Sequence, residues 1–210
     1  MGPADPLPVD ETMGRREPSV AGSSSTEGWS SSRYQLIVVL VASLIFGISI
    51  VSPPSLMDDV DSVQAQIARN MLDSGDWVTA RLDGVAYLEK APLKYWLMAI
   101  SYIIFGVHDW AARIPLALSA ILLCWVTARF GTWAFGWRAG LYSGIVLSTC
   151  AGLFLFTRIL IPDVMLTLAI TVALWSLMRT LDEQEQKAAQ WAYLMWAAAA
   201  VGLPLEQPAS

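Results

Sequence analysis

The chain has 210 residues, of which 55% are hydrophobic and 15% charged, and its formal net charge is −5. Soluble domains usually carry about a quarter charged residues, so this composition excludes an ordinary soluble globule and favours a helical membrane protein. The acidic balance, with no basic stripe to follow a phosphate backbone, excludes a nucleic-acid partner. Cys124 and Cys150 both lie inside apolar runs, and we expect both to be small buried hydrophobic side chains.

Residues 1–33 differ in character from the rest of the chain. They are rich in Pro, Gly and Ser and nearly free of large apolar side chains, a composition that cannot bury a core and predicts a disordered tail. An apolar run follows over residues 34–51 and ends at Ser52-Pro53-Pro54. It is long and has no clear cleavage site after it, so we expect an uncleaved first span rather than a signal peptide.

Three acids follow the first span: Asp58, Asp59 and Asp61. Apolar residues at helical spacing over 60–74 predict an amphipathic helix on the membrane surface. The acids could serve as the cap and first turn of that helix. They exceed what one cap needs, so a catalytic carboxylate among them is the competing interpretation.

A second group of ionisable and aromatic residues lies at 87–96, in Tyr87-Leu88-Glu89-Lys90-Ala91-Pro92-Leu93-Lys94-Tyr95-Trp96. Charges beside a bilayer are costly and often mark a reaction centre. A plainer interpretation is an interfacial ion pair of Glu89 and Lys90, with Lys94 extending to the lipid headgroups. The amphipathic run 93–107 is about 15 residues long, shorter than the roughly 20 residues that a transmembrane helix needs. We therefore expect it to lie at the interface rather than cross the membrane.

Four further spans are predicted, at 112–130, 139–159, 164–181 and 191–203. The fold expected is thus an all-α polytopic membrane protein with about five transmembrane helices and two interfacial helices in the first outer loop. If 93–107 is interfacial, that loop and the turn carrying Asp163 lie on the same membrane side; if it spans, they lie on opposite sides. Plain basic loops place the N-terminus in the cytoplasm and the acidic loop outside.

The residues that could perform chemistry would then converge at headgroup depth. A carboxylate there can act as a general base on a hydroxyl. Lys90 and Arg158 can hold a phosphate and offset its developing charge. Asp163 sits in a tight hairpin after Pro162, where its alternative role is to cap the next helix. This arrangement suits transfer of a group carried on a lipid phosphate.

The order of these motifs resembles the N-terminal part of the GT-C membrane glycosyltransferases. The similar features are the acidic first loop, Ile67-Ala68-Arg69-Asn70-Met71-Leu72, the 87–96 segment, Ala112-Arg113-Ile114-Pro115, Arg158 and Pro162-Asp163. The nearest group is the family-39-like enzymes, which include lipid A aminoarabinose transferases and protein mannosyltransferases. The resemblance covers residues 34–203.

The resemblance implies transfer of a sugar, with inversion, from a polyprenyl phosphate to an acceptor hydroxyl of lipid A, protein or glycan. It implies a multi-pass protein of the bacterial inner (plasma) membrane with its site on the periplasmic side. Asp59, or else Asp58 or Asp61, matches the family base, and Asp163 matches the second aspartate. Tyr87, Glu89 and Lys90 match the Tyr-x-Glu-Lys motif, which puts Lys90 near the donor phosphate and Glu89 near the acceptor or a divalent metal.

Two departures from the family limit that inference. The loop reads Asp-Asp-Val-Asp-Ser-Val-Gln where relatives often have Asp-Glu-x-Arg-Tyr, so an expected donor contact is missing. The chain also stops at residue 210, where we expect more spans. We therefore interpret residues 34–205 as the N-terminal part of the transferase domain and 206–210 as a divergent tail. The competing function is a non-catalytic membrane fragment or an accessory subunit that binds lipid carriers.

Overall fold

The protein folds as a bundle of helices with one small hairpin. The computed structural model describes residues 2, 24–51, 56, 59–87 and 92–206. Its elements in chain order are α1 (Ser24–Val51), α2 (Asp59–Ser74), β1 (Arg81–Leu82), β2 (Val85–Ala86), α3 (Leu93–Phe105), α4 (Asp109–Phe135), α5 (Trp137–Ser148), α6 (Ala151–Arg158), α7 (Asp163–Leu181) and α8 (Ala188–Glu206).

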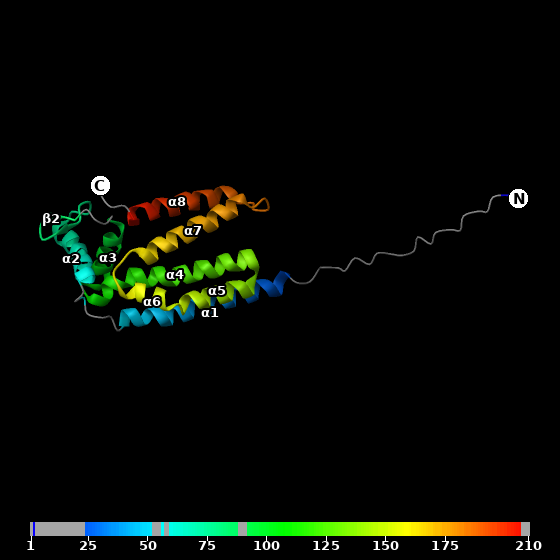
Figure 1. The fold of residues 1–210 in the computed structure, drawn as a ribbon, viewed down its shortest axis with the longest axis horizontal. Helices are drawn as coiled ribbons and strands as arrows, with labels where there is room; N and C mark the ends of the chain where they lie inside the picture. The colour runs from blue at the N-terminus through cyan, green and yellow to red at the C-terminus, as the bar shows by residue number, and fades with distance from the viewer. Residues whose placement is uncertain (1, 3–23, 52–55, 57–58, 88–91, 207–210) are drawn as a thin grey trace.

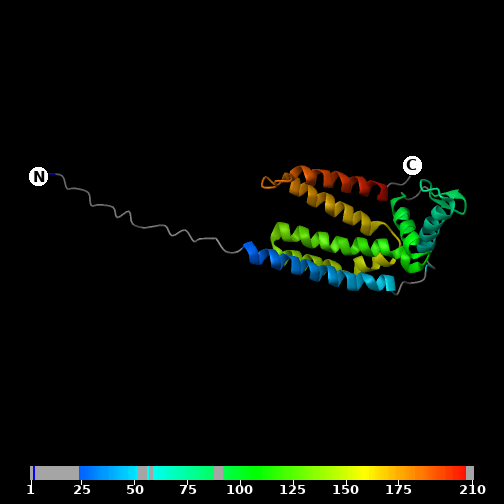
Figure 2. The ribbon, with the colours of Figure 1, turned by 180° about the vertical axis from the view of Figure 1, so that it is seen from behind.

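The elements divide into a long bundle and a cap at one end of it. Figures 1 and 2 show α1, α4, α5 with α6, α7 and α8 running along the long axis of the molecule. Helices α2 and α3 and the hairpin gather at one end, with α3 lying across the bundle rather than alongside it. The turn between α7 and α8 lies at the opposite end (Figure 1). The predicted all-α fold is confirmed, with residues 93–105 in the cap and not among the long helices.

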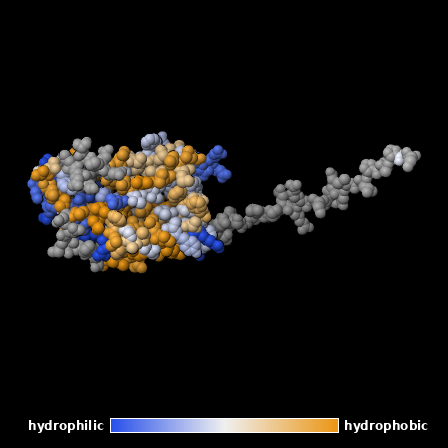
Figure 3. All heavy atoms as spheres, in the orientation of Figure 1, coloured by the Kyte–Doolittle hydropathy of each residue, from blue (hydrophilic) through white to orange (hydrophobic). Residues whose placement is uncertain are grey.

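By length and composition, two of the described helices can each cross a membrane: α4 and α7. The pair α5 and α6 forms a third candidate if the two are counted as one bent span. Shorter apolar stretches occupy 32–48, 93–105 and 188–203. Figure 3 shows hydrophobic residues over much of the bundle and many of the most hydrophilic residues towards its ends. This surface is typical of helices that face lipid.

A bend separates α5 from α6, where the sequence predicts one continuous span. The two axes differ by 49°. The hydroxyls of Ser148 and Thr149 both donate hydrogen bonds to the Ile145 carbonyl, at 2.8 and 2.9 Å. Such bonds from Ser and Thr to the preceding turn compete with the helix ladder and bend helices. The exposed Cys150 follows directly, which corrects the expectation that both cysteines are buried; Cys124 is buried as predicted.

Two glycines let α5 approach α4 and α1 closely. A Cβ built on Gly140 would lie 2.5 Å from the Ala128 carbonyl oxygen and 2.7 Å from the Thr132 nitrogen. A Cβ on Gly144 would lie 2.7 Å from a methyl group of Val38. Small residues four positions apart allow this kind of close helix packing in membranes.

The cap has a small core of its own. A buried cluster joins α2, the hairpin and α3, and it consists of Ile67, Met71, Ala80 and Tyr95. The partly buried Tyr87 packs against it. The hairpin pairs Arg81 with Ala86 and Leu82 with Val85. Its turn, Asp83-Gly84, has positive φ at both residues, 51° and 81°, which suits the Asp-Gly sequence. The cap therefore packs as a unit.

Helix boundaries mostly follow the sequence pattern. Helix α2 covers the predicted amphipathic segment, with Ile67, Ala68 and Met71 on its buried face. Helix α1 begins at Ser24, ten residues before the expected start at Tyr34. Residues 3–23 and 207–210, and with them most of the predicted tail and of the divergent end, lie outside the described residues.

Candidate active site

The chain leaves helical geometry between α6 and α7, at residues 159–162. Ile159 is extended, with φ −107° and ψ 136°. The N–H and C=O of the next residue, Leu160, are buried, and such groups need partners. Both partners come from the cap: the Asp61 Oδ1 accepts from the Leu160 N–H at 2.8 Å, and the Lys94 Nζ donates to the Leu160 carbonyl at 3.4 Å. The cap thus binds the α6–α7 connection directly.

Asp61 and Arg113 form a buried ion pair between α2 and α4. The Arg113 Nη2 lies 2.6 Å from the Asp61 Oδ2, and the side chains are 0% and 6% exposed. Arg113 also donates to the carbonyl oxygens of Asp109, at 3.3 Å, and Arg158, at 3.4 Å. Opposite charges that are buried need such pairing, because desolvation of either alone is expensive. Both Asp61 oxygens are engaged, one by Arg113 and one by Leu160.

Lys94 is the second buried cation at this junction. It is 1% exposed, and its Nζ donates to the Gln64 Oε1 on α2 at 2.5 Å. The alternative interpretation, in which Lys94 extends to the headgroups, is therefore wrong for Lys94. The reason is geometric: Lys94 lies in the first turn of α3 on the face turned to α2, where Gln64 and the Leu160 carbonyl offer acceptors.

The structure places only some of the predicted site residues. Asp58, Glu89 and Lys90 lie outside the described residues, and Asp59 begins α2 without a described side chain. Asp61 is in the buried junction. Arg158 ends α6, with its guanidinium carbon 5.5 Å from the centre of the Phe154 ring.

The remaining two predicted residues lie at the edges of the junction. Asp163 begins α7 and is exposed, and its carbonyl accepts from the Thr167 hydroxyl at 2.7 Å. Tyr87 follows the hairpin, half-buried, and its N–H donates to the Ala80 carbonyl at 2.7 Å. The structure thus brings Asp61, Arg158 and the start of α7 to one end of the bundle.

Arg113, Gln64 and Lys94 were not predicted as site residues. Arg113 is the fifth residue of α4, near the start of an apolar span, and Lys94 lies in the first turn of a short apolar helix. Positive charges near span ends usually set the topology of the protein in the membrane or extend to the interface. The sequence alone therefore did not indicate that Arg113 and Lys94 are buried partners. One signal was available: a charge on the buried face of a helix needs a partner of opposite charge, and Asp61 was nearby in the loop.

No group of three or more His, Cys, Asp or Glu side chains suited to a metal ion occurs among the described residues. The predicted metal ligand, Glu89, lies outside them. A metal contact at Glu89 therefore stays a prediction.

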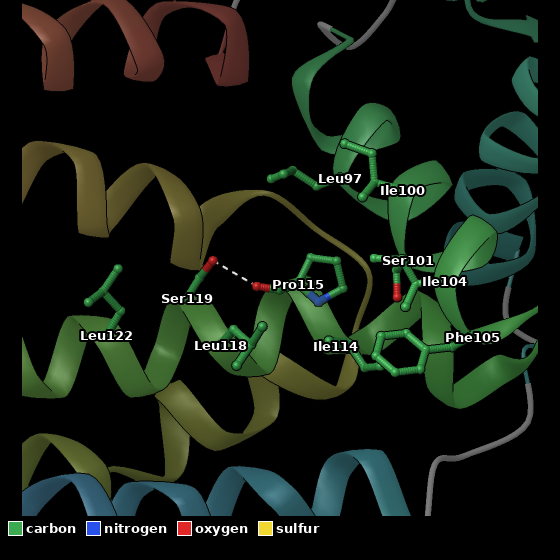
Figure 4. Close-up of a pocket in the computed structure, with 10 residues that line it drawn as sticks. All are labelled: Leu97, Ile100, Ser101, Ile104, Phe105, Ile114, Pro115, Leu118, Ser119 and Leu122. Atoms are coloured by element: carbon green, nitrogen blue, oxygen red, sulfur yellow. Dashed lines mark hydrogen bonds between the residues drawn. The ribbon is translucent and has the colours of Figure 1, made fainter.

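An apolar cavity of about 330 Å³ opens between α3 and α4 beside the junction (Figure 4). Ser119 is one of its few polar lining residues, and its hydroxyl donates to the Pro115 carbonyl at 2.7 Å. A second apolar cavity of about 340 Å³ lies between α3, α4, α7 and α8. The two share Leu97, Ser119 and Leu122 in their walls, so they adjoin.

Fold and site together define a polytopic all-α membrane protein in which the buried charged residues Asp61, Lys94 and Arg113 meet at one end of the bundle. Residues 89–206 match the family described as dolichyl-phosphate-mannose-protein mannosyltransferase. The chain belongs to this family, and the resemblance to GT-C glycosyltransferases of the lipid A aminoarabinose transferase type is confirmed.

Individual relatives agree with that assignment. The undecaprenyl phosphate-alpha-4-amino-4-deoxy-L-arabinose arabinosyl transferase of Enterobacter sp. (strain 638) is 25% identical over 79% of this chain and 30% of its own length. A relative of the same description in Pseudomonas fluorescens, transferase 2, is 35% identical over 51% of this chain and 19% of its own length.

Solved structures share the fold. The crystal structure of ArnT from Cupriavidus metallidurans in the apo state has a TM-score of 0.76 and 26% identity, over 84% of this chain and 33% of that one. The structure of the same protein bound to undecaprenyl phosphate has a TM-score of 0.75 and 27% identity, over 87% of this chain and 33% of that one. This chain thus spans about a third of the length of these structures.

Proposed function

We propose that this protein takes part in the transfer of a sugar from a polyprenyl phosphate to an acceptor hydroxyl, at the outer face of the bacterial plasma membrane. The relatives are undecaprenyl-phosphate aminoarabinose transferases, and one similar structure holds undecaprenyl phosphate. The acceptor we expect first is lipid A, with protein or another glycan as the alternatives.

One observation in the chain itself carries the proposal. The Asp61–Leu160 hydrogen bond, 2.8 Å long, joins residues 99 positions apart and draws the start of α2 to the start of α7. Asp61, Arg158 and Asp163 thereby share one end of the bundle, and Asp59 and Asp58 stand two and three positions before Asp61 in the sequence. Such clustering of acids and bases suits a single reaction centre.

The proposed reaction needs a base and a cation. A first-loop carboxylate removes the proton of the acceptor hydroxyl. The acceptor oxygen then attacks the anomeric carbon, the bond from that carbon to the phosphate oxygen breaks, and polyprenyl phosphate leaves with the electron pair. We assign the base to Asp59 or Asp58, because both oxygens of Asp61 are already engaged. Lys90 and Arg158 would offset charge on the phosphate.

The other site residues would orient the substrates. We assign Asp163, Glu89 and Tyr87 to the acceptor side, with Glu89 as the candidate metal ligand. The adjoining apolar cavities beside α3 and α4 suit contact with hydrocarbon, and we propose that lipid chains of the substrates lie near them.

The test is a transfer assay in membranes that contain the protein in the full length its gene encodes. Membranes are incubated with an undecaprenyl phosphate-linked aminoarabinose donor and lipid A, and the products are identified by mass spectrometry. We expect wild-type protein to add the sugar, and Asp59→Asn and Asp163→Asn each to reduce turnover by about 10²- to 10⁴-fold. A donor carrying mannose and a protein acceptor form the second arm.

Asp83→Asn is the matched control. Asp83 is an exposed acid of the cap hairpin, and Asn tolerates its positive φ of 51°. We expect this variant to retain activity. Wild-type turnover in Asp163→Asn, at equal protein level, would contradict the proposed site.

A further inference from the structure

One network of four side chains is centred on a single residue of the α6–α7 connection. Its members are Asp61, Gln64, Lys94 and Arg113. Leu160 is completely buried. Its N–H is held by Asp61 and its carbonyl by Lys94. Asp61 is fixed in turn by Arg113, and Lys94 by Gln64. Four side chains from α2, α3 and α4 thus set where this stretch of backbone lies.

The connection makes few backbone hydrogen bonds of its own. Between Arg158 and Asp163 the described backbone makes two local ones outside the helices: the Ile161 N–H donates to the Ile159 carbonyl at 2.8 Å, and the Pro162 carbonyl accepts from the Leu166 N–H at 2.9 Å. An extended segment with little local bonding takes its position from its surroundings. Here those surroundings are the network and the apolar core in which the Leu160 side chain is buried. Arg113 also donates to the last carbonyl of α6, that of Arg158.

Charged partners suit this task. Hydrogen bonds in which one partner is charged are stronger than neutral ones. The bonds of Lys94 to Gln64 and of Arg113 to Asp61 are short, at 2.5 and 2.6 Å, whereas those to the carbonyls of Leu160 and Arg158 are longer, at 3.4 Å each. Buried polar networks favour a single arrangement over alternatives when their groups are satisfied; here both Nη atoms of Arg113 have partners, whereas its buried Nε has none among the described residues.

We infer that Lys94 and Arg113 are positioning residues: through Leu160 they hold Arg158 and Asp163 in register with the acidic start of α2. Neither residue need touch substrate for this. The inference rests on the proposed function for its catalytic consequence, whereas the positioning itself can be measured without substrate.

The experiment uses a pair of substitutions at Gln64. Gln64→Met removes the oxygen that binds Lys94 and keeps the length of the side chain, whereas Gln64→Glu keeps an oxygen acceptor at the same place. Each is combined with Ile161→Cys, a half-buried position in the connection, in a background without Cys124 and Cys150. The rate of labelling by a small thiol reagent reports how firmly the connection is held, with Gln186→Cys at the far end of the bundle as the reference.

We expect Gln64→Met to speed labelling at position 161 several-fold and to leave labelling at position 186 unchanged. Gln64→Glu should label like the parent. In the transfer assay, run without Ile161→Cys, Gln64→Met should lower kcat by about 10- to 100-fold with little change in the donor KM, and Gln64→Glu should restore most of the loss. Lys94→Met should match Gln64→Met in both readouts.

Three results would overturn the inference. Unchanged labelling at position 161 in both Gln64→Met and Lys94→Met shows that the network does not hold the connection. Equal damage from Gln64→Glu and Gln64→Met shows that the hydrogen bond is irrelevant. A raised donor KM with unchanged kcat shows that Lys94 acts on substrate. Absence of transfer by wild-type protein contradicts the proposed function instead, and the labelling result still decides the positioning.

Discussion

At the scale of single residues, the buried pair of Asp61 and Arg113 makes the strongest prediction for stability. Arg113→Met would leave the Asp61 carboxylate buried with its Leu160 bond but without a cation. Removal of one partner from such a pair costs about 3–5 kcal/mol. We expect that loss in the free energy of unfolding, measured by denaturant titration in detergent, with reagent access to the buried Cys124 as the signal after Cys150→Ser.

The double variant Asp61→Leu with Arg113→Met provides the control. It buries no unpaired charge, so its loss of unfolding free energy should be smaller than the sum of the two single losses. Simple additivity would contradict a direct interaction between the two side chains.

Asp76, in the loop after α2, makes a prediction about pH. The N–H groups of Thr79 and Val78 donate to its carboxylate at 3.0 and 3.1 Å. These two hydrogen bonds lower the pKa of Asp76 below its ordinary value, and the bond from Thr79 has the larger effect. A lowered carboxyl pKa stabilises the loop above the ordinary value of about 4, and this contribution is lost as the pH falls through the lowered pKa.

Hydrogen exchange at the Val78 and Thr79 amides measures this effect. Their protection should hold at neutral pH and decline below about pH 4. Asp76→Asn should give weaker protection that no longer depends on acid, because its side chain does not titrate. Wild-type protection that persists unchanged at the lowest pH would contradict the role of the carboxylate.

The sequence indicated those site residues whose local sequence context was unusual, and it missed those whose role depends on tertiary contacts. Asp61 stood out as an acid just past a span. Arg113 and Lys94 did not, because a cation near a helix end has several ordinary uses, and only the tertiary fold reveals that Asp61 and Leu160 lie against them. Buried pairing between residues 52 positions apart, as for Arg113 and Asp61, leaves no local pattern.

At the scale of elements, the approach of α5 to α4 depends on Gly140. A Cβ there would clash with backbone atoms of Ala128 and Thr132, which cannot move away as a flexible side chain could. We expect Gly140→Ala to cost roughly 1–3 kcal/mol of unfolding free energy, as overpacking does elsewhere. The same denaturant titration measures it.

Gly47→Ala in α1 is the matched substitution, because a Cβ there meets nothing within 4 Å. It should leave the free energy of unfolding unchanged or slightly raised, since Ala favours the helix. Equal losses in the two variants would mean that glycine flexibility, and not close packing, is what matters at position 140.

Apolar periodicity predicted the helices well and missed what interrupts them. Helices α2, α4, α7 and α8 follow runs that the sequence makes plain. The hairpin at 81–86 has strands of two residues each, too short for an alternating pattern to indicate. The bend after Ser148 comes from hydroxyl bonds to the preceding turn, which a hydropathy profile does not register.

At the scale of the whole molecule, the fold class and the convergence of the loop after α1 on the α6–α7 turn could be predicted from the sequence. The decisive step was to treat 93–107 as a helix outside the spans, on its length and amphipathic pattern. In the structure α3 lies across the end of the bundle (Figures 1 and 2). The details of that convergence could not be predicted, because they depend on buried partners far apart in the chain.

The central claim is that the cap and the α6–α7 turn share the outer face of the membrane, with the α7–α8 turn on the inner face. The most direct measurement is cysteine labelling in intact cells, with a membrane-impermeant thiol reagent and a background without Cys124 and Cys150. Single cysteines replace Val60 and Val85 in the cap and Gln186 in the α7–α8 turn, all exposed. We predict labelling at 60 and 85 from outside, and at 186 only after the cells are opened. Labelling of all three from outside would contradict the account, because α7 would then fail to carry the chain across the membrane away from the cap.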